Sequence, residues 1–225
     1  MKALIVGSAR SSGGVDHADL VARLAAEADL VIAADGGGAL CLEAGILPAL
    51  VVGDLDSLPP RDGADLEAAD VRFVRVPSDK DETDLDIAIG EARARRAHSL
   101  VATGVLGGRL DHTLASLGSL TSAAELEPIV TEPDTTVWIM RNGAREQLDL
   151  AGVGATVSLL AWCEPAVVTC QGFRYPLRST TLAPLSSLGM SNVTTGADAT
   201  ITVSSGTLLV VTTSVGELRQ ASQRA

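Results

Sequence analysis

Residues 30–57 read LVIAADGGGALCLEAGILPALVVGDLDS and contain two short apolar runs, each of which ends in aspartate and glycine. Up to about residue 132, short apolar runs of this kind alternate with helical patterns, which is typical of a parallel sheet with crossover helices. Polar residues and glycines that directly follow such strands lie at the edge where open α/β sheets bind ligands. The stretch therefore predicts both a fold class and the position of a site.

The wider sequence extends this pattern into a complete domain. Strands are expected at 3–6, 30–33, 50–52, 72–76, 100–103 and 128–131. Helices are expected at 19–28, 84–95 and 111–124, where apolar residues recur every three or four positions. We predict an α/β domain over residues 1–132, with a doubly wound, mostly parallel sheet.

The composition changes after residues 132–134, where Val-, Thr- and Leu-rich runs are broken by glycine at short intervals. Strands are expected at 137–140, 155–161, 166–170, 199–203 and 207–213, and no helix is expected between them. This pattern predicts a small antiparallel β sandwich or barrel over residues 133–225.

Composition and charge exclude several classes of protein. The 225 residues are 46% hydrophobic, enough for a sizeable core, but Phe, Trp and Tyr together number five, so base-stacking nucleic-acid binding is not expected. The formal net charge of −11 argues against binding a nucleic acid or an anionic membrane by charge alone, so a phosphate ligand would be bound through metal ions. No apolar run approaches the roughly 18 residues of a membrane span. Three cysteines without C-x-x-C spacing fit a reducing cytoplasm.

Two carboxylates follow the expected strand 50–52. Asp54 and Asp56 are two residues apart, so in an extended segment both point to one side, as a shared hard cation such as Mg²⁺ requires. The alternative is a solvated turn that begins the next helix, because Asp and Ser are good N-caps.

Segment 77–84 places four carboxylates around Lys80, one of only two lysines in the chain. A lone lysine among acids at a strand end indicates a point charge directed at phosphate. Alternatively, Lys80 balances its neighbours while Thr83 or Asp81 caps the helix from Asp84 onward. A cap at Thr83 would place Asp84 on the first helical turn, where it could complete a three-carboxylate metal site with the preceding pair.

Two glycine-rich segments also follow strands. In segment 34–38, glycines let backbone N–H groups approach a phosphate or sugar, although such a cluster is more often a tight turn without a ligand. Segment 103–112 is a glycine loop that enters a helix with Arg109, Asp111 and His112 in its first turns. It matches neither the P-loop nor the G-x-G-x-x-G pattern, but its N–H groups and Arg109 could form an anion cradle. His112 alone is more often a packed or capping histidine than a catalyst.

Six segments in order resemble the thiamine pyrophosphokinase family: 35–37, 53–57, 79–84, 104–112 with its Gly-Gly-Arg-x-Asp-His core, 172–177 and 189–192. The resemblance implies an N-terminal α/β domain that binds ATP and Mg²⁺ and a C-terminal β domain for thiamine binding and dimerisation. It also implies a homodimer with shared active sites. The implied reaction is transfer of pyrophosphate from ATP to the hydroxyethyl oxygen of thiamine, with AMP as the other product.

The resemblance also implies residue roles by motif position. The implied metal ligands are Asp54, Asp56 and Asp84, which together with Lys80 and Asp81 form the implied catalytic set. The implied ATP site comprises Asp35, Gly36, Gly37, Lys80, Gly107, Gly108, Arg109, Asp111 and His112. The implied thiamine site comprises Thr83, Ser191 and Asn192. Either Asp81 or Asp84 is a candidate to take the proton of the alcohol.

Two other functions stay open from the sequence. One is a pyrophosphokinase that acts on another hydroxymethyl heterocycle, such as a pterin. The other is a catalytically inactive regulatory module that binds a nucleotide or thiamine. The carboxylate set and Lys80 argue against the second, because a pure binder has no need of three converging acids.

Overall fold

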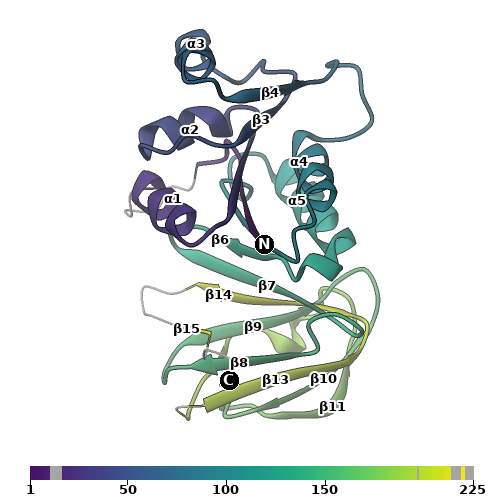
Figure 1. The fold of residues 1–225 in the computed structure, drawn as a ribbon. Coiled ribbons are helices and arrows are strands. Elements are labelled where there is room, and N and C mark those ends of the chain that lie inside the picture. Colours follow the sequence, from purple (N-terminus) through teal and green to yellow (C-terminus); the bar gives the residue numbers. More distant parts are fainter. Residues whose placement is uncertain (11–16, 197, 214–218, 221–225) are drawn as a thin grey trace. The chain divides into compact units, whose positions relative to one another are not determined.

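The computed structural model describes residues 1–10, 17–196, 198–213 and 219–220. The chain divides into two compact units, Met1–Pro133 and Asp134–Ala225 (Figure 1). The sequence prediction places the division one residue earlier, after residue 132.

A six-stranded parallel sheet forms the centre of the first unit, in the order β6-β5-β1-β2-β3-β4. Its strands are β1 (Lys2–Val6), β2 (Leu30–Ala34), β3 (Leu50–Gly53), β4 (Arg72–Arg75), β5 (Ser99–Thr103) and β6 (Ile129–Thr131). The chain runs outward from β1 to β4 and then returns to place β5 on the other side of β1. The carboxyl ends of β1 and β5 therefore flank a topological switch point, where sheets of this class bind ligands.

Helices cover both faces of this sheet. They are α1 (His17–Ala26), α2 (Gly37–Glu43), α3 (Pro60–Ala68), α4 (Asp84–Ala94) and α5 (Leu110–Ser122), followed by the 3₁₀ turn η1 (Ala124–Leu126). In Figure 1, α1 to α3 lie on one side of the sheet and α4 and α5 on the other. Strand β3 is consequently buried along its whole length, whereas the edge strand β4 is largely accessible. The predicted doubly wound α/β fold is confirmed, and α2 and α3 are additional to the three predicted helices.

Two antiparallel sheets form the second unit, in the orders β12-β9-β14-β7 and β11-β10-β13-β8-β15. The strands are β7 (Thr135–Arg141), β8 (Gln147–Ala151), β9 (Thr156–Ala161), β10 (Ala166–Gln171), β11 (Leu177–Leu182), β12 (Asn192–Val193), β13 (Asp198–Ser205), β14 (Thr207–Thr213) and β15 (Arg219–Gln220). Strands β7 and β13 bring the two sheets into contact, so the unit is a β sandwich.

The second unit contains the 3₁₀ turn η2 (Ser187–Gly189) and no α-helix in its described part, as predicted. Over both units, none of the described helices has the length and apolar character needed to cross a membrane.

Candidate active site

A cavity of about 590 Å³ lies in the first unit, where β1, β2, β3 and β5 end. This volume is in the range of about 300–1,000 Å³ found for small-molecule sites. Of the residues predicted from the sequence, the lining includes Asp35, Asp54, Asp56, Lys80, Thr83, Asp84, Gly107, Arg109, Asp111 and His112. The parallel sheet thus brings together side chains from segments far apart in the sequence.

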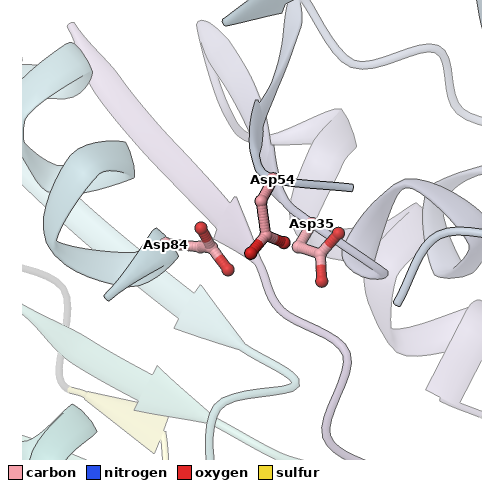
Figure 2. A group of neighbouring side chains, drawn as sticks. All are labelled: Asp35, Asp54 and Asp84. Atoms are coloured by element: carbon pink, nitrogen blue, oxygen red, sulfur yellow. The ribbon is translucent and has the colours of Figure 1, made fainter. Parts of the chain in front are cut away.

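Three carboxylates converge in this cavity (Figure 2). One oxygen each from Asp35, Asp54 and Asp84 lies within 4.8 Å of the others. Asp35 follows β2, Asp54 follows β3, and Asp84 opens α4. The Oδ1 atom of Asp35 is buried and has no hydrogen-bond partner among the described residues. Hard divalent cations prefer oxygen ligands, so this oxygen set, with its unsatisfied buried acceptor, fits Mg²⁺.

The geometry differs in one member from the predicted metal set. Asp54 and Asp84 belong to the converging group, whereas the third member is Asp35, which the resemblance implies for the nucleotide. Asp56 lines the same cavity, and its carboxylate accepts a hydrogen bond from the hydroxyl of Ser57 at 3.0 Å.

Gly53 packs closely against two of the converging acids. A Cβ atom built at this position would lie 3.0 Å from the Cβ of Asp35 and 3.1 Å from Oδ1 of Asp84. A side chain there would therefore require Asp35 and Asp84 to shift by a few tenths of an ångström. Asp35 itself has a φ of 47°, a left-handed conformation that Asp and Asn tolerate better than most residues.

The environments of two of these carboxylates differ. Burial raises the pKa of Asp35, and the negative charges of Asp84 and Asp56 raise it further. Hydrogen bonds from Ser57 lower it in part. The pKa of Asp54 is lowered, mainly because it accepts a hydrogen bond from the backbone N–H of Asp56. The site therefore favours the charged form of Asp54 and disfavours that of Asp35, an effect that a nearby positive charge would offset.

Lys80 supplies a positive charge beside Asp54 and Asp84. Its Nζ atom lies 3.1 Å from Oδ1 of Asp84 and 3.9 Å from Oδ2 of Asp54. The lysine balances the acids, as one sequence interpretation expects, and it also lines the cavity. Its role toward phosphate stays a prediction.

A capping box places Asp84 on the first turn of α4. The hydroxyl of Thr83 accepts a hydrogen bond from the N–H of Asp86, and the carboxylate of Asp86 accepts one from the N–H of Thr83 at 3.0 Å. The predicted N-cap at Thr83 is confirmed, and the alternative cap, Asp81, is exposed. The Thr83 hydroxyl also donates to Asp86 at 2.6 Å, so its role toward thiamine stays a prediction.

The glycines after β2 pack against the protein. A Cβ atom at Gly37 would lie 1.9 Å from the carbonyl oxygen of Val6, so α2 approaches β1 too closely for any side chain there. This agrees with the interpretation of the glycine cluster as a tight turn without a ligand. Gly36 and Gly37 are absent from the described cavity lining, as are Asp81 and Gly108. Their predicted roles toward ATP and in catalysis are not tested by this geometry.

The loop after β5 is held from inside the protein. The N–H groups of Gly104, Val105 and Leu106 all donate to the carboxylate of Glu132, at 3.0, 2.9 and 3.0 Å. The next N–H group, that of Gly107, donates to the hydroxyl of Thr113. The sequence predicts that these N–H groups bind an anion from solution. In the structure they already donate hydrogen bonds to protein side chains.

Arg109 and Asp111 form an exposed ion pair at the start of α5, with Nη2 2.6 Å from Oδ2. The hydrogen bond from Arg109 lowers the pKa of Asp111 to about 2. Both side chains and His112 line the cavity. Arg109 thus places a positive charge beside the cavity in addition to that of Lys80.

Sequence reasoning missed several residues of the site. Gly7 and Ser8 line the cavity directly after β1, and the rule applied to the other strand ends would have found them. Ser57 and Ser78 also belong to the lining. Glu132 carries no local motif, so nothing in the sequence marks it as a partner of the loop 28 residues earlier.

The candidate thiamine residues lie in the second unit. Asn192 is 5% exposed; its Oδ1 atom accepts from the N–H of Tyr175, and its Nδ2 atom donates to the Tyr175 carbonyl. This side chain joins segments 172–177 and 189–192, two of the six in the resemblance. Ser191 is exposed and has a φ of 52°. A contact of either residue with thiamine stays a prediction.

The fold and the site define an α/β protein with a carboxylate-lined ligand site at the switch point of a parallel sheet, followed by a β sandwich. Residues 21–130 match the family model described as "Thiamin pyrophosphokinase, catalytic domain", and residues 145–208 match "Thiamin pyrophosphokinase, vitamin B1 binding domain". The chain belongs to the thiamine pyrophosphokinase family.

Individual relatives agree with this assignment. The chain is 27% identical over 187 residues to thiamine pyrophosphokinase of Bacillus subtilis, covering 82% of this chain and 87% of the relative. It is similar to the crystal structure of thiamin pyrophosphokinase from Geobacillus thermodenitrificans, with 28% identity, a TM-score of 0.80 and coverage of 96% and 99%. The Candida albicans thiamin pyrophosphokinase shares the fold, with 15% identity, a TM-score of 0.79 and coverage of 95% and 90%. These matches favour neither the pterin alternative nor the inactive module.

Proposed function

We propose that this chain transfers the pyrophosphoryl group of ATP to the hydroxyl group of thiamine, forming thiamine diphosphate and AMP. The observation that carries the proposal is the convergence of Asp35, Asp54 and Asp84 beside Lys80, in a cavity at the carboxyl edge of the sheet. Family membership supports thiamine as the acceptor. Pyrophosphoryl transfer depends mainly on positioning and on neutralising phosphate charge, and these groups are suited to both.

In the proposed step, the hydroxyl oxygen of thiamine forms a bond to the β-phosphorus of ATP. The bond from that phosphorus to the oxygen bridging it to the α-phosphate breaks, and AMP leaves with this oxygen. The hydroxyl proton passes to a carboxylate. Of the two candidates, Asp84 lines the cavity and Asp81 does not appear in its described lining, so Asp84 is better placed to accept the proton.

We propose that Asp35, Asp54 and Asp84 hold Mg²⁺, with Asp56 beside them. When bound, Mg²⁺ neutralises phosphate charge and orients the phosphates for in-line displacement. Lys80 adds a point charge directed at the same phosphates. A protein with a net charge of −11 can bind ATP in this way, because its acids act through the cation.

The nature of the nucleotide product tests the proposal. Purified protein with Mg-ATP and thiamine should release AMP in equal amount to thiamine diphosphate, because the attack is at the β-phosphorus. Chromatography with mass spectrometry identifies both products. Thiamine-dependent release of ADP would refute the proposed step, and thiamine binding without any turnover would favour an inactive binding module.

We further propose a homodimer with shared active sites, in which the carboxylate cluster works with Ser191 of the partner subunit and Asn192 of the partner subunit. The family resemblance supports this arrangement. Co-expression of Asp54→Asn subunits with Ser191→Trp subunits should restore about a quarter of wild-type activity, because half of the randomly paired dimers each regain one intact site. Native mass spectrometry confirms that heterodimers are present. Activity no higher than the sum of the two separate variants would rule out a shared site.

We also propose a cytoplasmic location. The three cysteines, Cys41, Cys163 and Cys170, are all free thiols. Free thiols of this kind persist in a reducing compartment.

A further inference from the structure

Glu132 is a buried acid that the proposed reaction does not use. It directly follows β6, and the whole residue is 5% exposed. An ionised carboxylate at this depth is costly unless hydrogen bonds or charges compensate it. Its partners are therefore informative about what it does.

Those partners belong mainly to the loop after β5. Oε1 of Glu132 accepts from the N–H groups of Val105 and Leu106, and Oε2 accepts from that of Gly104. Three successive amides thus converge on one carboxylate, which is the arrangement by which a backbone loop binds an anion. Here the anion is part of the protein.

His17 and Thr103 complete the surroundings of Glu132. Nε2 of His17 lies 2.9 Å from the hydroxyl oxygen of Thr103 and 3.3 Å from Oε2 of Glu132. The Thr103 hydroxyl can donate to the same carboxylate oxygen at 3.5 Å. With a hydrogen on Nε2, His17 can donate to either of these oxygens. One carboxylate consequently connects the start of α1, the end of β5 and the end of β6.

The loop held in this way forms part of the cavity wall. Gly104 and Val105 line the cavity, and the chain continues through Gly107 to Arg109, which lines it as well. The amides bonded to Glu132 are already satisfied. The wall residues that follow, Gly107 and Arg109, therefore continue from a segment whose backbone is hydrogen-bonded inside the protein.

We propose that Glu132 is a positioning residue for nucleotide binding: it serves as an internal anion that fixes the 104–106 loop and thereby the cavity wall leading to Arg109. This inference rests on the proposed function for the identity of the ligand, a nucleoside triphosphate. The effect of Glu132 on the loop itself does not depend on that function and can be measured without substrate.

Glu132→Gln is the test variant, because it keeps the shape and one acceptor but replaces the second acceptor with an NH₂ group that faces backbone N–H groups. In the substrate-free protein, hydrogen–deuterium exchange at residues 104–106 should become about tenfold faster or more, because the opening of these bonds controls exchange. The dissociation constant for Mg-ATP, from calorimetry, should rise about tenfold, while that for thiamine stays within about twofold. Glu132→Asp keeps the charge on a shorter arm and should give intermediate values.

Two variants serve as controls. Glu125→Gln removes an equal charge from an exposed ion pair with Arg93 and should change neither measurement. Leu66→Ala lowers stability by truncating a fully buried side chain of α3 and should leave the Mg-ATP constant within about twofold. Unchanged loop exchange or an unchanged Mg-ATP constant in Glu132→Gln would overturn the inference, as would an equal rise in Leu66→Ala. Failure of the proposed function can be distinguished from failure of this inference. In the first case wild-type protein forms no AMP, but the exchange and ATP-binding measurements still decide the role of Glu132.

Discussion

Asp54→Asn and Asp84→Asn should each lower kcat/KM for Mg-ATP by about a hundredfold or more, because each removes a charged ligand from a hard-cation site. Asp35→Asn should cause a comparable loss, since its carboxylate belongs to the same converging group. Initial rates of AMP formation across a range of Mg²⁺ concentrations measure the effect. Raised Mg²⁺ should partly restore the rate if the lost function is metal binding.

Asp56→Asn discriminates between the two versions of the metal set. The sequence predicts Asp56 as a ligand, whereas in the structure Asp35 is the third member of the converging carboxylates, so Asp56→Asn should reduce the rate less than Asp35→Asn. Asp65→Asn changes an exposed acid on α3 and is the matched control for the loss of one charge. Near-normal activity in Asp54→Asn would contradict the metal assignment altogether.

Thermal unfolding in the presence of a chelator shows whether these losses come from the fold. The folded-state pKa of Asp35 is raised, so its ionised form destabilises the metal-free protein once the pH exceeds the unfolded and folded pKa values. Asparagine keeps an acceptor for the N–H of Ser57 and tolerates the left-handed φ at this position. The melting temperature of Asp35→Asn at neutral pH should therefore hold or rise.

Lys80→Met should raise the KM for Mg-ATP or lower kcat by about tenfold or more, with little change in thiamine binding. Methionine keeps an unbranched apolar stem but removes the charge that lies 3.1 Å from Asp84. Steady-state kinetics with each substrate varied in turn separates the two effects.

Lys80→Arg is the matched variant at the same position. It should restore only part of the rate, because a planar guanidinium is bulkier and aims its donors differently from an ammonium group. If Lys80→Met keeps the kinetic constants of the wild type, the role of the lysine is only to balance the charge of the neighbouring acids.

Much of the first unit could be predicted because its elements are marked locally. Strands such as β1 and β3 are covered on both faces, so they appear in the sequence as continuous apolar runs. The cap at Thr83 was also readable, since a capping box is a contact between residues three apart.

The missed elements lack such local marks. Strand β8 has the sequence QLDLA and β11 has LRSTTL; both mix polar and apolar residues and acquire their structure by pairing with neighbours. Helix α2 has seven residues, too few to show a helical period clearly. Context, rather than propensity, decides such segments.

The same distinction applies to the site. The position of Asp54 and Asp84 near each other followed from the rule that parallel strands end at one edge. The same rule puts Asp35 at this edge, but the resemblance assigned it to the nucleotide, because the sequence does not show which of the acids at the edge point toward one another. The direction of the loop amides toward Glu132 likewise depends on β6 lying beside β5, which only the assembled sheet provides.

Gly53 gives the carboxylate cluster a further property. A methyl group at residue 53 would lie 3.0 Å from the Cβ atom of Asp35 and 3.1 Å from Oδ1 of Asp84, so the backbone of β3 packs closely against both acids and limits how their side chains can move. Spacing fixed by a backbone is stiffer than spacing set by freely rotating side chains. Ion size is then a criterion for binding: Mg²⁺ demands near-ideal octahedral geometry at about 2.0–2.1 Å, whereas Ca²⁺ accepts more ligands at longer range in a flexible cage. For the proposed metal site, we therefore expect the absence of a Cβ atom at residue 53 to contribute to the choice between these two cations.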